Sequence, residues 1–87
     1  MKNIFKIFKR KITVEYIKKH FTESFESFYP AFVIGTIDSD YGELLAIEIR
    51  DDRFCLVRGY SVSSYWLIDV EYVSDLKRLI KLYKVKK

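Results

Sequence analysis

The chain has 87 residues, of which 49% are hydrophobic and 17% aromatic, and its formal net charge is +4. A chain of this length supports a single hydrophobic core, and this composition argues against disorder and against any need for disulfides or metal to hold the fold. Cys55 is the only cysteine, so it cannot form an internal disulfide, and we expect a reducing, cytoplasmic location.

Charge is distributed in three blocks. Residues 1–20 carry seven bases and one acid, residues 21–76 carry three bases and eleven acids, and residues 77–87 carry six bases and no acid. This asymmetry favours either an anionic partner for the two ends or ends that fold back onto the acidic middle. No apolar run is long enough to span a bilayer, and the N-terminus lacks the apolar stretch of a signal peptide, so we expect neither.

Two helical patterns begin the chain. Residues 1–12 form a basic amphipathic segment that is compatible with a short extra helix. Residues 13–28 predict a longer helix, with Thr13 as its N-cap and its end set by Pro30. The apolar stripe of this helix consists of Val14, Ile17, Phe21, Phe25 and Phe28.

Four strands are expected next, at residues 31–38, 43–50, 53–60 and 65–71, joined by turns at 38–42, 51–52 and 59–64. Period-two alternation assigns the side chains to faces. Facing inward we expect Leu45, Ile47, Ile49, Phe54 and Leu56, and in the last strand Trp66, Ile68 and Val70. Facing outward or toward an edge we expect Leu44, Ala46, Glu48, Arg50, Cys55 and Val57.

A second helix follows, with Ser74 as N-cap and an apolar side formed by Val73, Leu76, Leu79, Ile80 and Tyr83, and residues 84–87 form a basic tail. The predicted fold is one small α+β domain over residues 1–87. It consists of a helix, a four-stranded antiparallel meander ordered as in the chain, and a C-terminal helix. Both helices are expected to pack on one face of the sheet, and the alternative is one helix on each face.

Catalytic and metal-binding signatures fail on count or spacing. Asp38, Asp40 and Glu43 alternate as in a calcium loop, but the glycine and the distal glutamate of that loop are absent at the required positions. Residues 59–63 lack the second glycine of a nucleophile elbow. His20 is the only histidine, and we expect it to be solvated. The sequence therefore predicts no enzyme, no cofactor and no metal site.

The leading hypothesis is a non-enzymatic protein-binding module that acts as an inhibitor, immunity or adaptor protein. Tyrosine is enriched in protein interfaces, and the chain has seven. The candidate partner-binding residues are Tyr41, Tyr60, Tyr65, Asp38 and Asp40, and Tyr16 and Tyr29 are also expected at the surface. A homodimer through an edge strand is a second form of this hypothesis. Small size and an excess of Lys and Ile are typical of accessory proteins of phages and mobile elements.

The alternative hypothesis assigns anion binding to the two basic ends, which could converge into one patch. Its ligand is either nucleic acid or an anionic membrane surface, bound weakly and with strong salt dependence. The residues that would carry it are Lys6, Lys9, Arg10, Lys11, Lys84, Lys86 and Lys87.

Overall fold

The computed structural model describes residues 9–24, 29–38, 42–60 and 63–86. The predicted core residues Phe25 and Phe28 lie outside these ranges, as do most of the residues of the predicted N-terminal helix. The backbone alone is described for Asp38, Tyr60, Ser63, Ser64 and Tyr65.

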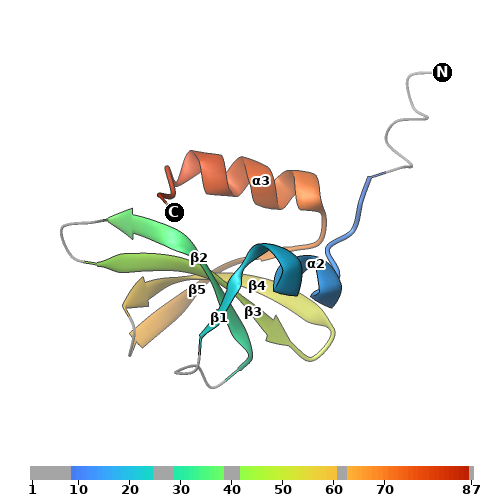
Figure 1. The fold of residues 1–87 in the computed structure, drawn as a ribbon, viewed down its shortest axis with the longest axis horizontal. Coiled ribbons are helices and arrows are strands. Elements are labelled where there is room, and N and C mark those ends of the chain that lie inside the picture. Colours follow the sequence, from blue (N-terminus) through green and yellow to red (C-terminus); the bar gives the residue numbers. More distant parts are fainter. Residues whose placement is uncertain (1–8, 25–28, 39–41, 61–62, 87) are drawn as a thin grey trace.

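A five-stranded antiparallel sheet forms the centre of the molecule (Figure 1). Its strands are β1 (Thr22–Ser24), β2 (Ala31–Asp38), β3 (Glu43–Arg50), β4 (Arg53–Tyr60) and β5 (Ser63–Val70), ordered as in the chain. Two helices complete the described fold, α2 (Val14–His20) and α3 (Val73–Leu82). The α+β class, the meander and the strand order are confirmed. The predicted count of four strands is wrong because β1 was not anticipated.

Strand β1 occupies residues 22–24 of the helix that was predicted over residues 13–28. The helix begins as expected, since the Thr13 side chain accepts a hydrogen bond of 3.1 Å from the backbone N–H of Tyr16. It ends after His20, because Phe21 has extended backbone angles of φ −133° and ψ 156°. The next three residues then pair antiparallel with the start of β2. Within α2, Tyr16 is buried and Val14 is exposed, the reverse of the prediction for both residues.

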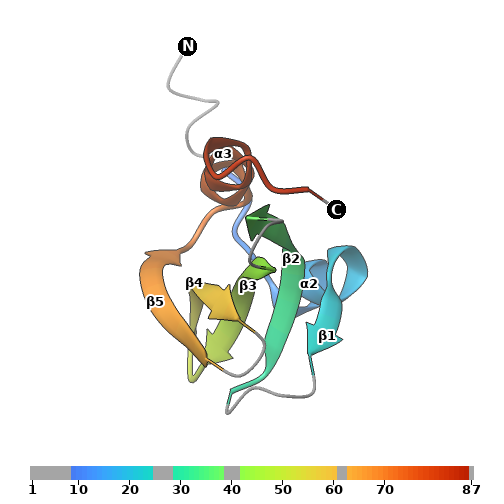
Figure 2. The same ribbon diagram turned by 90° about the vertical axis from the view of Figure 1, so that its left-hand side faces the viewer.

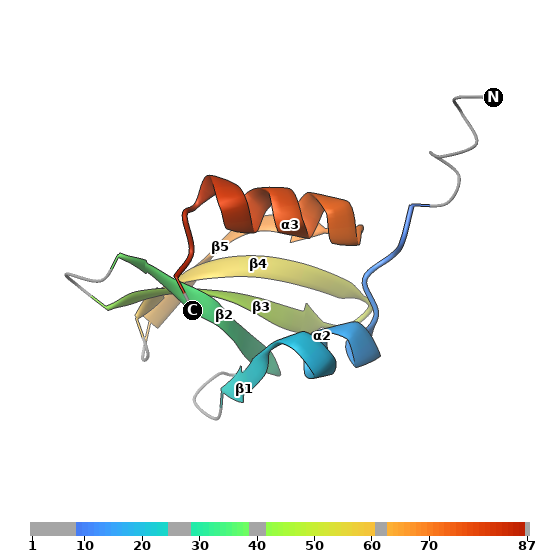
Figure 3. The ribbon, with the colours of Figure 1, turned by 45° about the horizontal axis from the view of Figure 1, so that its top comes forward.

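The core lies on one face of the sheet, where Phe32, Ile47 and Leu56 form a cross-strand row through β2, β3 and β4. Ile17 of α2 and Leu76 of α3 belong to the same buried cluster, so both helices pack on this face, which we call the helix face. Figures 2 and 3 show the curvature of the sheet, with α3 above it and α2 beside β1. The prediction that both helices share one face is confirmed.

Extended segments near the two chain ends continue the hydrogen bonding of the sheet. The N–H of Ile12 donates to the carbonyl oxygen of Glu71, and the N–H of Val73 donates to that of Arg10, each at 2.9 Å. Residues 9–12 are therefore extended and not helical, which corrects the described part of the predicted N-terminal helix.

The C-terminal tail is bound to β2. Both backbone groups of Thr36 bond to Lys86, at 2.8 and 2.9 Å, so the tail lies on the side of β2 away from β3. Gly35 makes this approach possible, because a Cβ there would lie 2.4 Å from Cγ1 of Val85.

The N-cap of helix α3 lies two residues earlier than predicted. Its N-cap is Tyr72, which makes no side-chain capping bond, and Ser74 lies inside the first turn, so Ser74 is not the N-cap. Among the described residues, neither helix has the length and apolar character needed to cross a membrane.

The core assignment predicts a large difference between two leucine truncations. Leu56→Ala removes a side chain that is 0% exposed and should lower the free energy of unfolding by about 2–5 kcal/mol. Leu82→Ala, at a position 69% exposed, should change it by no more than about 0.5 kcal/mol. Urea unfolding of the two variants measures both values, and equal losses would contradict the assignment.

Candidate functional site

Strand β5 contains one residue more than the facing part of β4. Ile68 pairs with Leu56, but the next pair along β4 is Val57 with Trp66, so Leu67 is an extra residue, that is, a β-bulge. Because side chains alternate between the two faces of a strand, one extra residue reverses the faces beyond it.

The bulge removes Trp66 from the predicted inward trio of Trp66, Ile68 and Val70, whereas Ile68 still pairs with the core residue Leu56. Val70 is buried and Leu67 packs against the core, whereas Ile68 is 46% exposed and Trp66 is 54% exposed. Trp66 lies opposite Val57, on the face away from the helices. The only tryptophan of the chain is thus a surface residue, which the sequence pattern did not indicate.

We call this second face of the sheet the outer face. Two cross-strand rows define it, Val33, Ala46, Val57 and Trp66 in the first and Ala31, Glu48, Cys55 and Asp69 in the second. Cys55 and Val57 are buried although they were expected at the surface or an edge, and they lie on β4, an interior strand that pairs with β3 on one side and β5 on the other. Glu48 was also expected in solvent, yet it is only 4% exposed.

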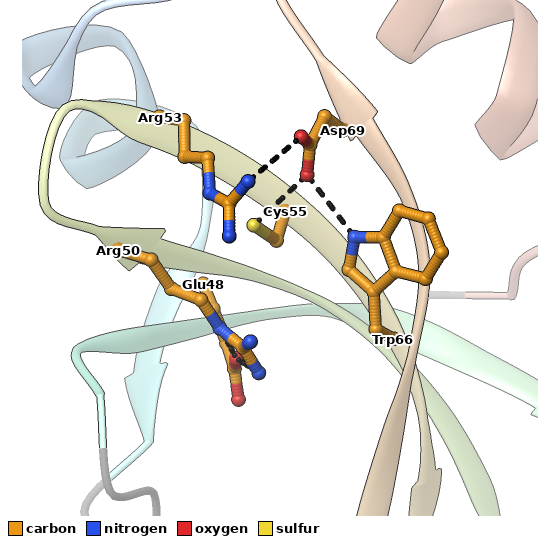
Figure 4. Close-up of polar contacts among 6 residues, drawn as sticks. All are labelled: Glu48, Arg50, Arg53, Cys55, Trp66 and Asp69. Carbon is orange, nitrogen blue, oxygen red and sulfur yellow. Dashed lines mark hydrogen bonds and ion pairs between the residues drawn. The ribbon is translucent and has the colours of Figure 1, made fainter.

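Asp69 connects the polar side chains at one end of this face (Figure 4). Its Oδ1 accepts hydrogen bonds from Nε1 of Trp66 at 3.0 Å and from Sγ of Cys55 at 3.1 Å. Its Oδ2 lies 3.5 Å from Nη1 of Arg53. Three donors from two strands therefore converge on one carboxylate, and the bond from Nε1 orients the indole ring of Trp66 toward it.

Arg50 neutralises the buried carboxylate of Glu48 in the same region (Figure 4). Nε and Nη2 of Arg50 both approach Oε1 of Glu48, at 2.8 and 2.7 Å. The guanidinium carbon of Arg50 also lies 4.6 Å from the centre of the Tyr29 ring, a cation–π distance. A buried carboxylate requires such a partner, since an unpaired charge there would strongly destabilise the fold. We call Glu48, Arg50, Arg53, Cys55, Trp66 and Asp69 the outer-face cluster.

The electrostatics of the cluster oppose proton abstraction and nucleophilic attack. The hydrogen bond from Trp66, followed by that from Cys55, lowers the pKa of Asp69, which makes it a weak base at neutral pH. Burial, followed by the hydrogen bond to Asp69, raises the pKa of the Cys55 thiol and so disfavours the reactive thiolate. The arrangement leaves the Trp66 indole half-exposed, with its Nε1 bonded to Asp69, beside the exposed guanidinium of Arg53.

A shallow depression of about 530 Å³ adjoins the cluster and shares Arg53 and Asp69 with it. Its charged lining has both signs, and it also includes apolar side chains. The remaining lining residues are Lys11, Asp52, Glu71, Ile12, Phe54 and Val70. The depression lies at the end of β4 and β5, where the core residues Ile12 and Val70 meet the exposed cluster residues Arg53 and Asp69.

Most of the partner-binding residues predicted from the sequence fall where side chains are not described. Tyr41 and Asp40 lie outside the described residues, and Asp38 is described only as the last residue of β2. The backbones of Tyr60 and Tyr65 lie on the neighbouring strands β4 and β5.

The other residues considered from the sequence are described in full. Glu43, weighed as a calcium ligand, is nearly buried and forms an ion pair with Arg58. Tyr16 is buried and not exposed, and Tyr29 is half-buried. His20 is exposed as expected, with its ring stacked on that of Tyr16.

Among the described residues, the bases of the two chain ends do not converge into one patch. Arg10 and Lys11 lie at the start of α3, where they bond to or pair with residues 71–73. Lys84 and Lys86 follow the end of the same helix, whose ten residues span about 15 Å. Lys6 and Lys87 are outside the described residues.

The residues that sequence reasoning missed are those of the outer-face cluster, and the one available signal was an aromatic residue in an edge strand.

Comparison with protein-family models, with curated proteins and with solved structures finds no match to this chain.

The lowered pKa of Asp69 predicts how stability changes with pH. A carboxylate whose pKa is lower in the folded state stabilises the fold above its unfolded pKa of about 3.9 and loses that contribution as the pH falls. Asp69→Asn should therefore lower the urea midpoint at pH 7, and the difference from wild type should shrink at pH 3.

Asp52→Asn, which removes an exposed carboxylate from the neighbouring turn, is the matched control and should shift the midpoint little at either pH. A wild-type advantage over Asp69→Asn that grows on acidification would show that the carboxylate is not stabilised in this way.

Proposed function

We propose that this protein is a non-enzymatic binding module that recognises a partner protein through the outer-face cluster, with Trp66 and Arg53 as the main contact residues. The observation that carries the proposal is the half-exposed indole of Trp66, held in place by Asp69. An inhibitor, immunity or adaptor protein works by such contact, since it occludes or links its partner without catalysing a reaction.

Residue chemistry supports a protein as the ligand. Tryptophan and arginine are the residue types most enriched where protein interfaces gain their binding energy. The charges of the cluster occur as the pairs Glu48–Arg50 and Arg53–Asp69, so the surface attracts neither cations nor anions strongly. Pre-ordered side chains also lose less conformational entropy when a partner binds.

The exposed area of the Trp66 side chain gives the expected loss of affinity when that side chain is removed. A tryptophan side chain can bury up to about 250 Å², so covering the exposed half of Trp66 removes on the order of 100 Å² from water. At about 25 cal/mol per Å² this contributes about 2–3 kcal/mol, which corresponds to a factor of about 30 to 150 in Kd.

The position of Trp66 on an edge strand favours a second form of the same proposal. β5 has eight residues and no further strand of the described chain pairs along its length. A second copy of the chain could add its own β5 there and cover both indoles at once, since edge strands offer unpaired backbone groups.

The test compares capture of proteins from a lysate of the source cells by wild type, Trp66→Ala and Leu82→Ala. Leu82→Ala is the matched control because it also removes an exposed apolar side chain, from α3. We expect a partner that wild type and the control retain and that Trp66→Ala binds at least about 30-fold more weakly. Capture that is the same with all three baits, or that never depends on Trp66, contradicts the proposal.

Sedimentation equilibrium of the same proteins tests the second copy as the occupant. Self-association lost in Trp66→Ala would identify the partner as this chain itself, and a monomer at every accessible concentration excludes it.

A further inference from the structure

We propose that the solvent-facing side of α3 binds the phosphate backbone of nucleic acid through a strip formed by Lys77, Arg78, Lys81 and Lys84. This inference goes beyond the proposed function, because the strip shares no residue with the outer-face cluster. It also differs from a patch made by two converging chain ends, since those ends lie at opposite ends of α3.

Helical geometry places the strip on the side of α3 away from the core. At about 100° per residue, Lys77, Arg78 and Lys81 fall within about 100° of one another, opposite the buried Leu76. All three are exposed, as is Lys84 at the end of the helix. Residues 77–86 contain five bases and no acid.

The acidic middle of the chain does not neutralise this strip. Its three arginines, Arg50, Arg53 and Arg58, pair with carboxylates of that same middle block. Among the described residues, the basic end blocks reach it through two ion pairs only, Lys11–Glu71 at 3.6 Å and Arg78–Asp75 at 3.5 Å. The charge of Lys77, Lys81 and Lys84 therefore remains directed to solvent.

Lys84 occupies a position that glycine would fill more easily. The N–H of Val85 bonds to the carbonyl oxygen of Ile80 at 3.3 Å, and that of Lys84 to the carbonyl oxygen of Lys81 at 3.1 Å, which is the Schellman pattern of a helix end. Lys84 accordingly has a left-handed φ of 54°. A lysine held in this conformation adds a charge at the end of the strip, where the helix dipole also favours it.

The packing of α3 favours nucleic acid over a membrane as the polyanion. A helix that binds a membrane surface inserts its apolar side, but Leu76, Leu79 and Ile80 pack against the protein core. Leu82 is the only large apolar side chain of α3 that is exposed. Lysines spaced along about 10 Å of helix instead suit contacts to successive phosphates, which require charge and no sequence readout.

The test uses fluorescence anisotropy of a labelled DNA duplex of about 20 base pairs, between about 50 and 200 mM salt. Lys77→Gln combined with Lys81→Gln removes two charges from the strip. Lys18→Gln combined with Lys19→Gln is the matched control, since it removes two exposed lysines from α2. All three proteins are first checked for the same thermal unfolding transition.

We expect wild-type affinity to fall steeply with salt, by about 100-fold if four phosphates are contacted. The strip variant should lose about 1.8 units of the slope of log K against log salt, and so should lose roughly tenfold less affinity over this range than wild type, while the control keeps the wild-type slope. Equal effects of the two double variants would mean that only net charge matters and would overturn the proposal. Absence of duplex binding at the lowest salt would overturn it as well, and retention on vesicles of anionic lipid in that case would assign the strip to a membrane.

Discussion

The extra residue in β5 determines what the outer surface of this protein looks like. Because strand side chains alternate with a period of two, the bulge at Leu67 puts that side chain against the core and turns Trp66 to the opposite face. On that face the indole N–H meets Asp69, whose carboxylate also accepts the Cys55 thiol and pairs with Arg53. Without the bulge, Trp66 would lie on the helix face, and the outer-face cluster would lose its largest side chain.

The charges of the chain sort into two groups with different surroundings. The three arginines of the middle block each pair with a carboxylate of the same block, including Arg50 with the buried Glu48. The lysines of α3 lie on the side of that helix that faces solvent, and in the described residues they form no ion pair with these acids. The sheet thus supplies a neutral surface centred on an aromatic side chain, and α3 supplies a positive one, which is why we assign the two surfaces to different ligands.

Strands β2, β3 and β4 could be predicted from the sequence with the bounds that the structure has, because alternation and turn residues give consistent signals there. The helix predicted over residues 13–28 ends at His20, and the sequence could not show this because pairing of Thr22 with Val33 depends on a contact that no local pattern indicates. The bulge was invisible because no local pattern distinguishes Leu67 as an added residue. Burial of Glu48 depends on its contact with Arg50, which in turn lies against Tyr29, and these contacts are not visible in the sequence. The candidate tyrosines were chosen for their residue type alone, so they did not point to the outer-face cluster.

The intrinsic fluorescence of Trp66 tests the central claim most directly, because it is the only tryptophan in the chain. In the folded protein the account predicts emission close to that of tryptophan in water and strong quenching by acrylamide, as befits an indole 54% exposed on the outer face. Unfolding in urea should then change the emission maximum little. A blue-shifted emission that resists acrylamide until the protein unfolds would show that Trp66 packs with Val70 in the core, and would contradict the bulge and the surface built on it.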